Sequence, residues 1–110
     1  MTAENILQEA DAIAGHSRSR DYGHPKVNHD RIAKMWNAYF SAKGDKVTVT
    51  AADVATMMIL LKIARHINSP KHDNLVDIAG YTKCLAMIHD SDANHKNGLD
   101  GPFTNTSEGE

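Results

Sequence analysis

Residues 51–67 form the stretch that most limits what this chain can fold into, because its residues before Lys62 include a single charged one. Between Lys46 and Lys62 the only charged residue is Asp53. A helix that is apolar on nearly every side lies at the centre of a helical bundle or in an interface between subunits. We therefore expect this helix to be the most buried one. We also expect a homodimer or homotetramer, with an interface near Met57, Met58 and Leu61.

Three further segments are predicted to be helical from the spacing of their apolar residues and from their end signals. They cover residues 2–14, 26–42 and 71–90. Pro25 suits the first turn of the second helix. Thr50 suits the N-cap of the third, and Asp53 completes a capping-box pair with it. The predicted fold class is all-α, a four-helix, bundle-like domain over residues 1–90 without a confident strand.

Size and composition exclude several classes of protein. A chain of 110 residues fits one domain, and a formal net charge of −2 gives no broad basic surface for nucleic acid. No run of 18 apolar residues could span a membrane, and the acidic N-terminal stretch does not resemble a secretory signal. The single cysteine, Cys84, rules out an internal disulfide and fits the cytoplasm. Residues 91–110 are polar, which predicts a disordered tail.

One face of the fourth helix carries two carboxylates a turn apart, Asp73 and Asp77. Paired carboxylates suit Mg²⁺, which takes oxygen ligands and often reaches phosphates through them. Gly80, Tyr81 and Cys84 continue the same face, and the thiol is expected to be an inert core group. Two other interpretations stay open. Asp73 is also a first-turn acid that the helix dipole favours, and Asp77 could pair with an arginine.

Cationic and polar residues that suit a nucleotide gather in two places. Lys62 and Arg65 could hold phosphate or pair with Asp77. The loop over residues 17–30 could supply cations for phosphate, a ring to stack on a base and an amide to read its edge. The loop residues are Arg18, Arg20, Asp21, Tyr22, His24, Lys26, Asn28 and His29. A solvated, charged loop is the alternative. No Cys/His quartet with zinc spacing, P-loop or Gly-rich dinucleotide fingerprint is present.

The stretches "RDYGHP", "ADVATMMILLKIARH" and "HDNLVDIAGY" together resemble a group of small phage and prophage proteins. These look like outlying members of the all-α nucleotide pyrophosphohydrolase (MazG-like) superfamily. The resemblance covers about residues 16–89. It implies an oligomeric helical bundle in which acids of two adjacent helices hold Mg²⁺, and in which a nucleoside triphosphate is hydrolysed to a monophosphate and pyrophosphate.

The metal motif of that superfamily is ExxE on one helix and ExxD on the next. The final Asp of ExxD matches Asp77, and the position three before it is Asn74. The third helix matches the ExxE helix loosely, with Asp53 at the first position of the motif and Thr56 three positions later. No glutamate occurs between Glu9 and Glu108. The resemblance therefore implies a metal site of three acids. These are Asp53, Asp73 and Asp77.

Three functions follow from these residues. The first is Mg²⁺-dependent pyrophosphohydrolysis, with Asp53, Asp77 and Lys62 as catalytic residues. The residues expected to bind the nucleotide are Arg18, Arg20, Asp21, Tyr22, His24, Asn28, Arg65 and Tyr81. The second is a non-catalytic phage protein that sequesters a signalling nucleotide. The third is a structural helical oligomer whose core is ordered by an Asp77–Arg65 pair.

Overall fold

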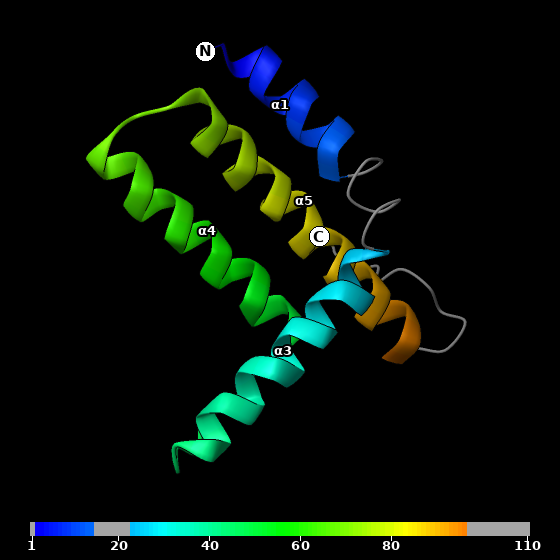
Figure 1. The fold of residues 1–110 in the computed structure, drawn as a ribbon. Coiled ribbons are helices and arrows are strands. Elements are labelled where there is room, and N and C mark those ends of the chain that lie inside the picture. Colours follow the sequence, from blue (N-terminus) through cyan, green and yellow to red (C-terminus); the bar gives the residue numbers. More distant parts are fainter. Residues whose placement is uncertain (1, 15–22, 97–110) are drawn as a thin grey trace.

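The computed structural model describes residues 2–14 and 23–96 of the chain, with side chains described as far as residue 93. The described residues form four helices and no strand (Figure 1). These helices are α1 (Ala3–Ala12), α3 (Pro25–Ala42), α4 (Ala51–Asn68) and α5 (His72–Lys96). The predicted all-α class is confirmed. None of the described helices is long and apolar enough to cross a membrane.

The helices α4 and α5 run antiparallel beside each other and meet at a tight corner near residues 69–71 (Figure 1). The helix α1 lies along α5 on the side away from α4. The helix α3 crosses the other end of this pair, and its C-terminal half projects beyond the rest of the molecule. The arrangement is therefore a helical hairpin with two helices added, and it departs from a regular bundle at α3.

Two small clusters of the core are both built on the first half of α4. On one side Val54 packs with Ala33 and Val49, and larger side chains of α3 and α4 surround them. These larger side chains are Ile32, Trp36, Phe40 and Met58. On the other side Ala51 and Ala55 pack against Ile88 of α5. Two alanines facing one isoleucine let α4 and α5 approach closely at this level.

The helix ends follow from residues that the sequence analysis identified. The Thr50 side chain accepts the backbone N–H of Asp53, and the Asp53 carboxylate accepts the N–H of Thr50, so the predicted capping box is confirmed. Pro25 begins α3, also as predicted. At the end of α3, Gly44 has φ +90°, and the next residue, Asp45, donates its N–H to the Phe40 carbonyl. A glycine tolerates this left-handed conformation, which reverses the chain after α3.

The link between α3 and α4 is fixed by the side chain of Asn37. Its Nδ2 donates to the Val49 carbonyl at 2.9 Å, and its Oδ1 accepts the Val49 N–H at 2.8 Å. One side chain thus satisfies both polar groups of a buried backbone position. This pair of hydrogen bonds ties the segment before α4 to the middle of α3.

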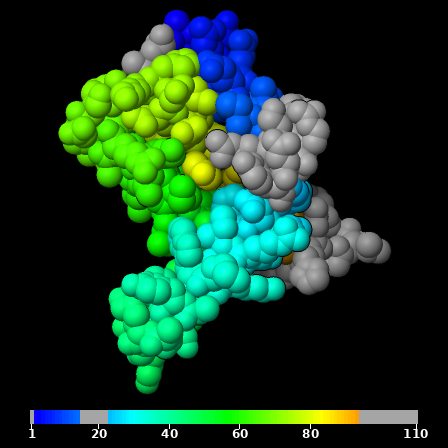
Figure 2. Space-filling model, in the orientation of Figure 1, coloured from blue at the N-terminus to red at the C-terminus, as the bar shows by residue number. Residues whose placement is uncertain are grey.

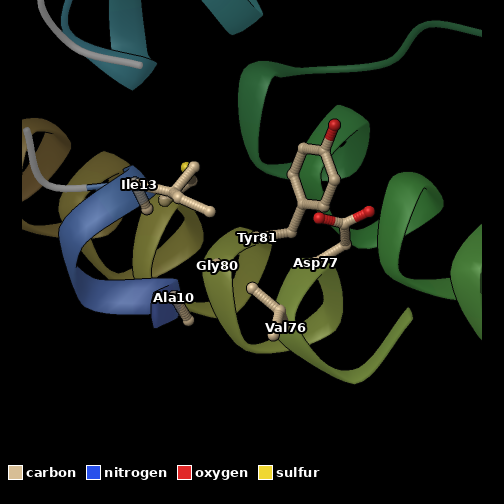
Figure 3. Close-up of a pocket in the computed structure, with 8 residues that line it drawn as sticks. Ala10, Ile13, Val76, Asp77, Gly80 and Tyr81 are labelled. Carbon is tan, nitrogen blue, oxygen red and sulfur yellow. The ribbon is translucent and has the colours of Figure 1, made fainter. Parts of the chain in front are cut away.

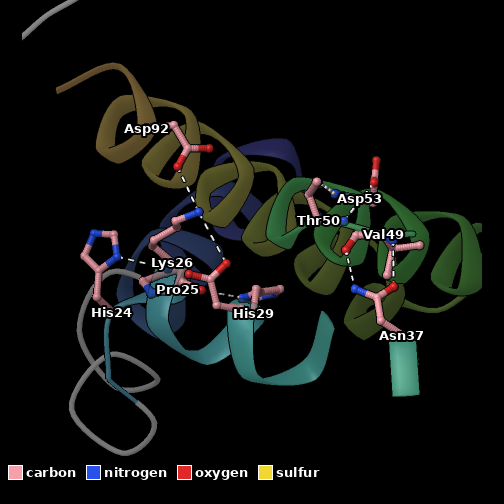
Figure 4. Close-up of polar contacts among 10 residues, drawn as sticks. His24, Pro25, Lys26, His29, Asn37, Val49, Thr50, Asp53 and Asp92 are labelled. Atoms are coloured by element: carbon pink, nitrogen blue, oxygen red, sulfur yellow. Dashed lines mark hydrogen bonds and ion pairs between the residues drawn. The ribbon is translucent and has the colours of Figure 1, made fainter. Parts of the chain in front are cut away.

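The boundary predicted at residue 90 is wrong, because α5 continues to Lys96. Asp92 in this extension forms an ion pair of 2.9 Å with Lys26 of α3 (Figure 4). The extension is therefore part of the folded body. The rest of the predicted tail, residues 97–110, lies outside the described residues.

The prediction that the third helix would be the most buried is also wrong for the single chain. Within α4 only Ala51, Val54 and Ala55 are buried. The second half of the helix exposes large aliphatic side chains, namely Met57, Leu60, Leu61, Ile63 and Ile67. Met58 differs from them because it packs against the core formed with α3. The predicted oligomer stays a prediction.

Candidate functional site

The carboxylate of Asp77, which lies among apolar residues in the sequence, is balanced across the α4–α5 contact. Its Oδ2 lies 2.9 Å from Nζ of Lys62, and the two side chains are 23 % and 17 % exposed. Lys62 was one of the two cations expected there. The alternative pairing with Arg65 is wrong, because among the described residues Arg65 forms no ion pair.

Asp77 also lines a small cavity, together with Tyr81 (Figure 3). The cavity lies between α1 and α5. Its volume is about 10 Å³, which is close to what one water molecule needs. A β-carbon at Gly80 would lie 3.9 Å from Cβ of Ala14, an ordinary contact. The cavity is therefore too small for a nucleotide, and Gly80 is not required by close packing there.

The three acids expected to hold a metal are not brought together in one chain. Asp53 takes part in the capping box of α4 and lies nine residues before Lys62, a separation of about 13–14 Å along a helix. Asp73 is exposed in the first turn of α5, one turn from Asp77. Residues 2–14 and 23–96 contain no group of three or more His, Cys, Asp or Glu side chains placed for a metal ion. The predicted facing of Asp53 and Asp77 is therefore wrong within the subunit.

The corner between α4 and α5 holds a larger, open groove of about 490 Å³. It is lined by Ala64, Arg65, Asn68, Ser69, Lys71 and Asn74. The corner is held by Asn74, which donates to the Ser69 carbonyl, and by His66, whose Nδ1 accepts the N–H of Lys71. Two cations and three neutral polar side chains line the groove, and no acid is among them. Such a lining suits an anion.

The nucleotide-binding residues expected in the early loop divide into two groups. Arg18, Arg20, Asp21 and Tyr22 lie outside the described residues. His24 is described, and its Nδ1 accepts the N–H of Lys26 as the N-cap of α3 (Figure 4). Asn28 lies in the first turns of α3 and is half-buried. Lys26 contacts Asp92, near the far end of α5, so His24 and Asn28 are well separated from the corner groove.

His29 is the buried polar residue at the α3–α5 contact. Its Nδ1 lies 2.9 Å from the Pro25 carbonyl, so this nitrogen carries the proton and donates. Its ring meets the Tyr81 ring edge-on, with centroids 6.2 Å apart. Burial lowers the pKa of His29 below its ordinary value of 6.5, and the Pro25 hydrogen bond and the Asp30 charge oppose that shift. His29 therefore joins α3 to Tyr81 as a neutral ring.

The lowered pKa of His29 predicts a loss of stability in mild acid. The folded state disfavours the second proton on the His29 ring. The contribution of His29 to the free energy of unfolding is therefore complete above about pH 6.5, and it is lost as the pH falls through the lower pKa of the folded state. We expect the urea midpoint to fall more between about pH 7.5 and about pH 5 in the wild type than in His29→Gln. An equal fall in both proteins would contradict this assignment.

Three residues of the groove were not predicted from the sequence, namely Lys71, Asn68 and Ser69. A signal was available in "NSPK", since Pro70 marks a sharp break between two helices and a lysine follows it directly. Side chains next to such a corner converge from both helix ends. Cys84 was read correctly as a core thiol, because it is 5 % exposed.

Residues 5–89 match the family described as "Domain of unknown function (DUF6378)". The chain belongs to this family. The matched DUF6378 segment takes in α4, the corner groove and the Lys62–Asp77 pair. It ends within α5, before the helical extension that carries Asp92.

Two curated relatives of this DUF6378 chain are phage proteins. The "Gene 55 protein" of Mycobacterium phage L5 is 50% identical over 85 residues, which cover 76% of this chain and 52% of the relative. The "Gene 55 protein" of Mycobacterium phage D29 is 36% identical over 89 residues, which cover 80% of this chain and 56% of the relative. The chain thus spans about half the length of the curated relatives it matches. No solved structure matches it. The expected resemblance to phage proteins is confirmed, and the MazG-like relationship stays a prediction.

Proposed function

We propose that this protein binds the phosphate groups of a nucleotide in the corner groove between α4 and α5. The observation that carries the proposal is the lining of this groove, which combines Arg65 and Lys71 with Asn68, Ser69 and Asn74. Its volume of about 490 Å³ falls within the range of small-molecule sites. Guanidinium and ammonium groups are the side chains that proteins use most for phosphate.

The ion pairs of the subunit support the assignment of these two cations. Lys62 is already matched by Asp77, Lys26 by Asp92 and Lys83 by Asp11. Among the described residues, Arg65 and Lys71 have no acid within ion-pair distance. Two neighbouring cations repel each other, and an anion between them relieves that repulsion.

Mg²⁺-dependent pyrophosphohydrolysis is the second candidate, favoured by the position of Asp73 and Asp77. These acids lie one turn apart on α5, next to the groove at Asn74. Mg²⁺ commonly binds one or two carboxylates together with substrate phosphates, and it would act there as a Lewis acid. Lys62 would then neutralise charge on the phosphates. Binding without turnover is preferred, because Asp53 lies far from the other two acids in the chain.

Calorimetric titration with nucleoside mono-, di- and triphosphates, with and without Mg²⁺, tests the proposal. Charge-assisted hydrogen bonds are worth about 1.5–3 kcal/mol, so Arg65→Ala and Lys71→Ala should each weaken binding about tenfold or more. Lys34→Ala is the matched control, because Lys34 is equally exposed but lies on α3. It should bind as the wild type does.

Two results would decide against phosphate binding in this groove. One is a wild-type protein that binds none of the nucleotides. The other is a loss of affinity in Lys34→Ala equal to that in Arg65→Ala. Chromatography of the same mixtures separates the two candidates. Pyrophosphate release that needs Mg²⁺ and is lost in folded Asp77→Asn would establish the enzyme, whereas unchanged nucleotide supports binding alone.

A further inference from the structure

From Met57 onward, α4 presents an apolar surface that none of the described residues of the subunit covers. This surface, called here the α4 face, consists of Met57, Leu60, Leu61, Ile63 and Ile67. Figure 2 shows α4 at an outer edge of the molecule, with no other helix laid over it in that view. Leu60 is 58 % exposed and Ile67 is 80 % exposed. A grouped apolar surface of this kind marks a contact with another molecule.

Four residues of the α4 face, Met57, Leu60, Leu61 and Ile67, follow the spacing of a helix-to-helix seam, and Ile63 lies at its edge. Positions 57, 61 and 64, and positions 60, 64 and 67, are spaced three or four apart, so together with Ala64 they form one stripe along α4. Ala64 is an exposed, small residue inside this stripe. A small side chain opposite a large one lets two helices interlock.

We propose that the α4 face is the contact with a second copy of this chain, in which the two α4 helices pack antiparallel about a twofold axis between Leu60 and Leu61. Two copies related in this way bring position 60 opposite position 61. They also bring Met57 opposite Ala64 of the second copy, so that a large residue meets a small one. One stripe then complements itself, as a twofold contact requires.

Charge favours the same orientation. Asp53 is the only charged residue in line with the stripe, and it lies at the N-terminal end of α4. A parallel pair of helices would set two Asp53 carboxylates side by side. In the antiparallel pair, Asp53 comes opposite Asn68 of the second copy and within about one turn of its Arg65, whose charge has the opposite sign. The stripe and the corner groove share Ala64, so the second copy would lie along one edge of the groove, but the inference is drawn from the exposed apolar side chains and not from nucleotide binding.

Sedimentation velocity from micromolar to several hundred micromolar protein tests the proposed contact. The wild type should sediment as a dimer at the upper concentrations. Leu60→Lys and Leu61→Lys should remain monomeric and keep wild-type helicity, because both positions lie at the proposed twofold axis and are exposed in the subunit. Leu7→Lys is the matched control: Leu7 is 63 % exposed but lies on α1, so this variant should dimerise as the wild type does.

Cysteine pairs test the orientation. In the antiparallel dimer, oxidation should join Met57→Cys/Ala64→Cys into a covalent dimer, while neither single variant does so. The native Cys84 is buried and present in all of them. Covalent dimers of Met57→Cys alone would overturn the antiparallel arrangement. A wild-type monomer at every concentration, or dimers of Leu60→Lys that persist, would overturn the contact itself.

Discussion

Replacing Ile88 by alanine should lower the free energy of unfolding by about 2–5 kcal/mol, which is the largest effect expected of any single change discussed. Ile88 is fully buried and is one of the two largest such side chains in the described chain. It packs on α5 against Ala51 and Ala55 of α4. These neighbours are too short to move into the space that the deletion leaves, so the cavity persists.

Urea denaturation monitored by circular dichroism measures this loss. Leu7→Ala provides the control, because it removes a similar aliphatic side chain from an exposed position. It should change the free energy of unfolding by no more than about 0.5 kcal/mol. A loss below about 1 kcal/mol for Ile88→Ala would mean that the α4–α5 contact at this level is looser than the structure has it.

Replacing Asp77 by asparagine should cost about 1–3 kcal/mol of stability. Breaking a fully buried ion pair costs about 3–5 kcal/mol, whereas an exposed pair is worth about 1 kcal/mol or less. The Lys62 and Asp77 side chains are 17 % and 23 % exposed, so the pair lies between these limits. After the change, Lys62 keeps its charge and can turn partly toward water, which moderates the loss.

A double-mutant cycle isolates the pair itself. Asp77→Asn, Lys62→Gln and the double variant should together give a coupling of about 1 kcal/mol or more, since the two residues are in direct contact. A coupling near zero would show that Asp77 is held by other groups and that the 2.9 Å contact adds little. In that case the role of Asp77 would have to be sought in ligand binding instead.

The parts of the fold that were predicted correctly depend on residues close together in the sequence. The capping box of Thr50 and Asp53 and the start of α3 at Pro25 are decided within one helical turn. The end of α5 was missed because the contact that supports it joins distant parts of the sequence. Asp92 is held by Lys26, 66 positions earlier, and no local pattern reports such a contact.

The candidate site shows the same division. Sequence spacing correctly placed Asp73 and Asp77 a turn apart, because this is a property of one helix. It could not place Asp53 relative to them, since that depends on the register between α4 and α5. In this register Lys62 contacts Asp77, while Ala51 and Ala55 contact Ile88. Asp53, which lies between Ala51 and Ala55, is therefore closer to Ile88 than to Asp77 along α5. The apolar sequence of α4 indicated burial but not whether the same chain or another supplies it.

The attachment of α1 bears on two free energies of this small protein, that of releasing α1 and that of unfolding the whole domain. Of the other described helices, α1 contacts only α5. The contact consists of small buried side chains such as Ala10 and Ala14, together with the exposed polar contacts Glu9–His72 and Asp11–Lys83. An element attached to a single neighbour is expected to open separately, at a lower free energy than the whole domain. Because Cys84 and Tyr81 line the cavity beneath α1, each opening would admit water to the face of α5 that carries Asp77. The protein can thus loosen at one face while the α3–α4–α5 core stays folded.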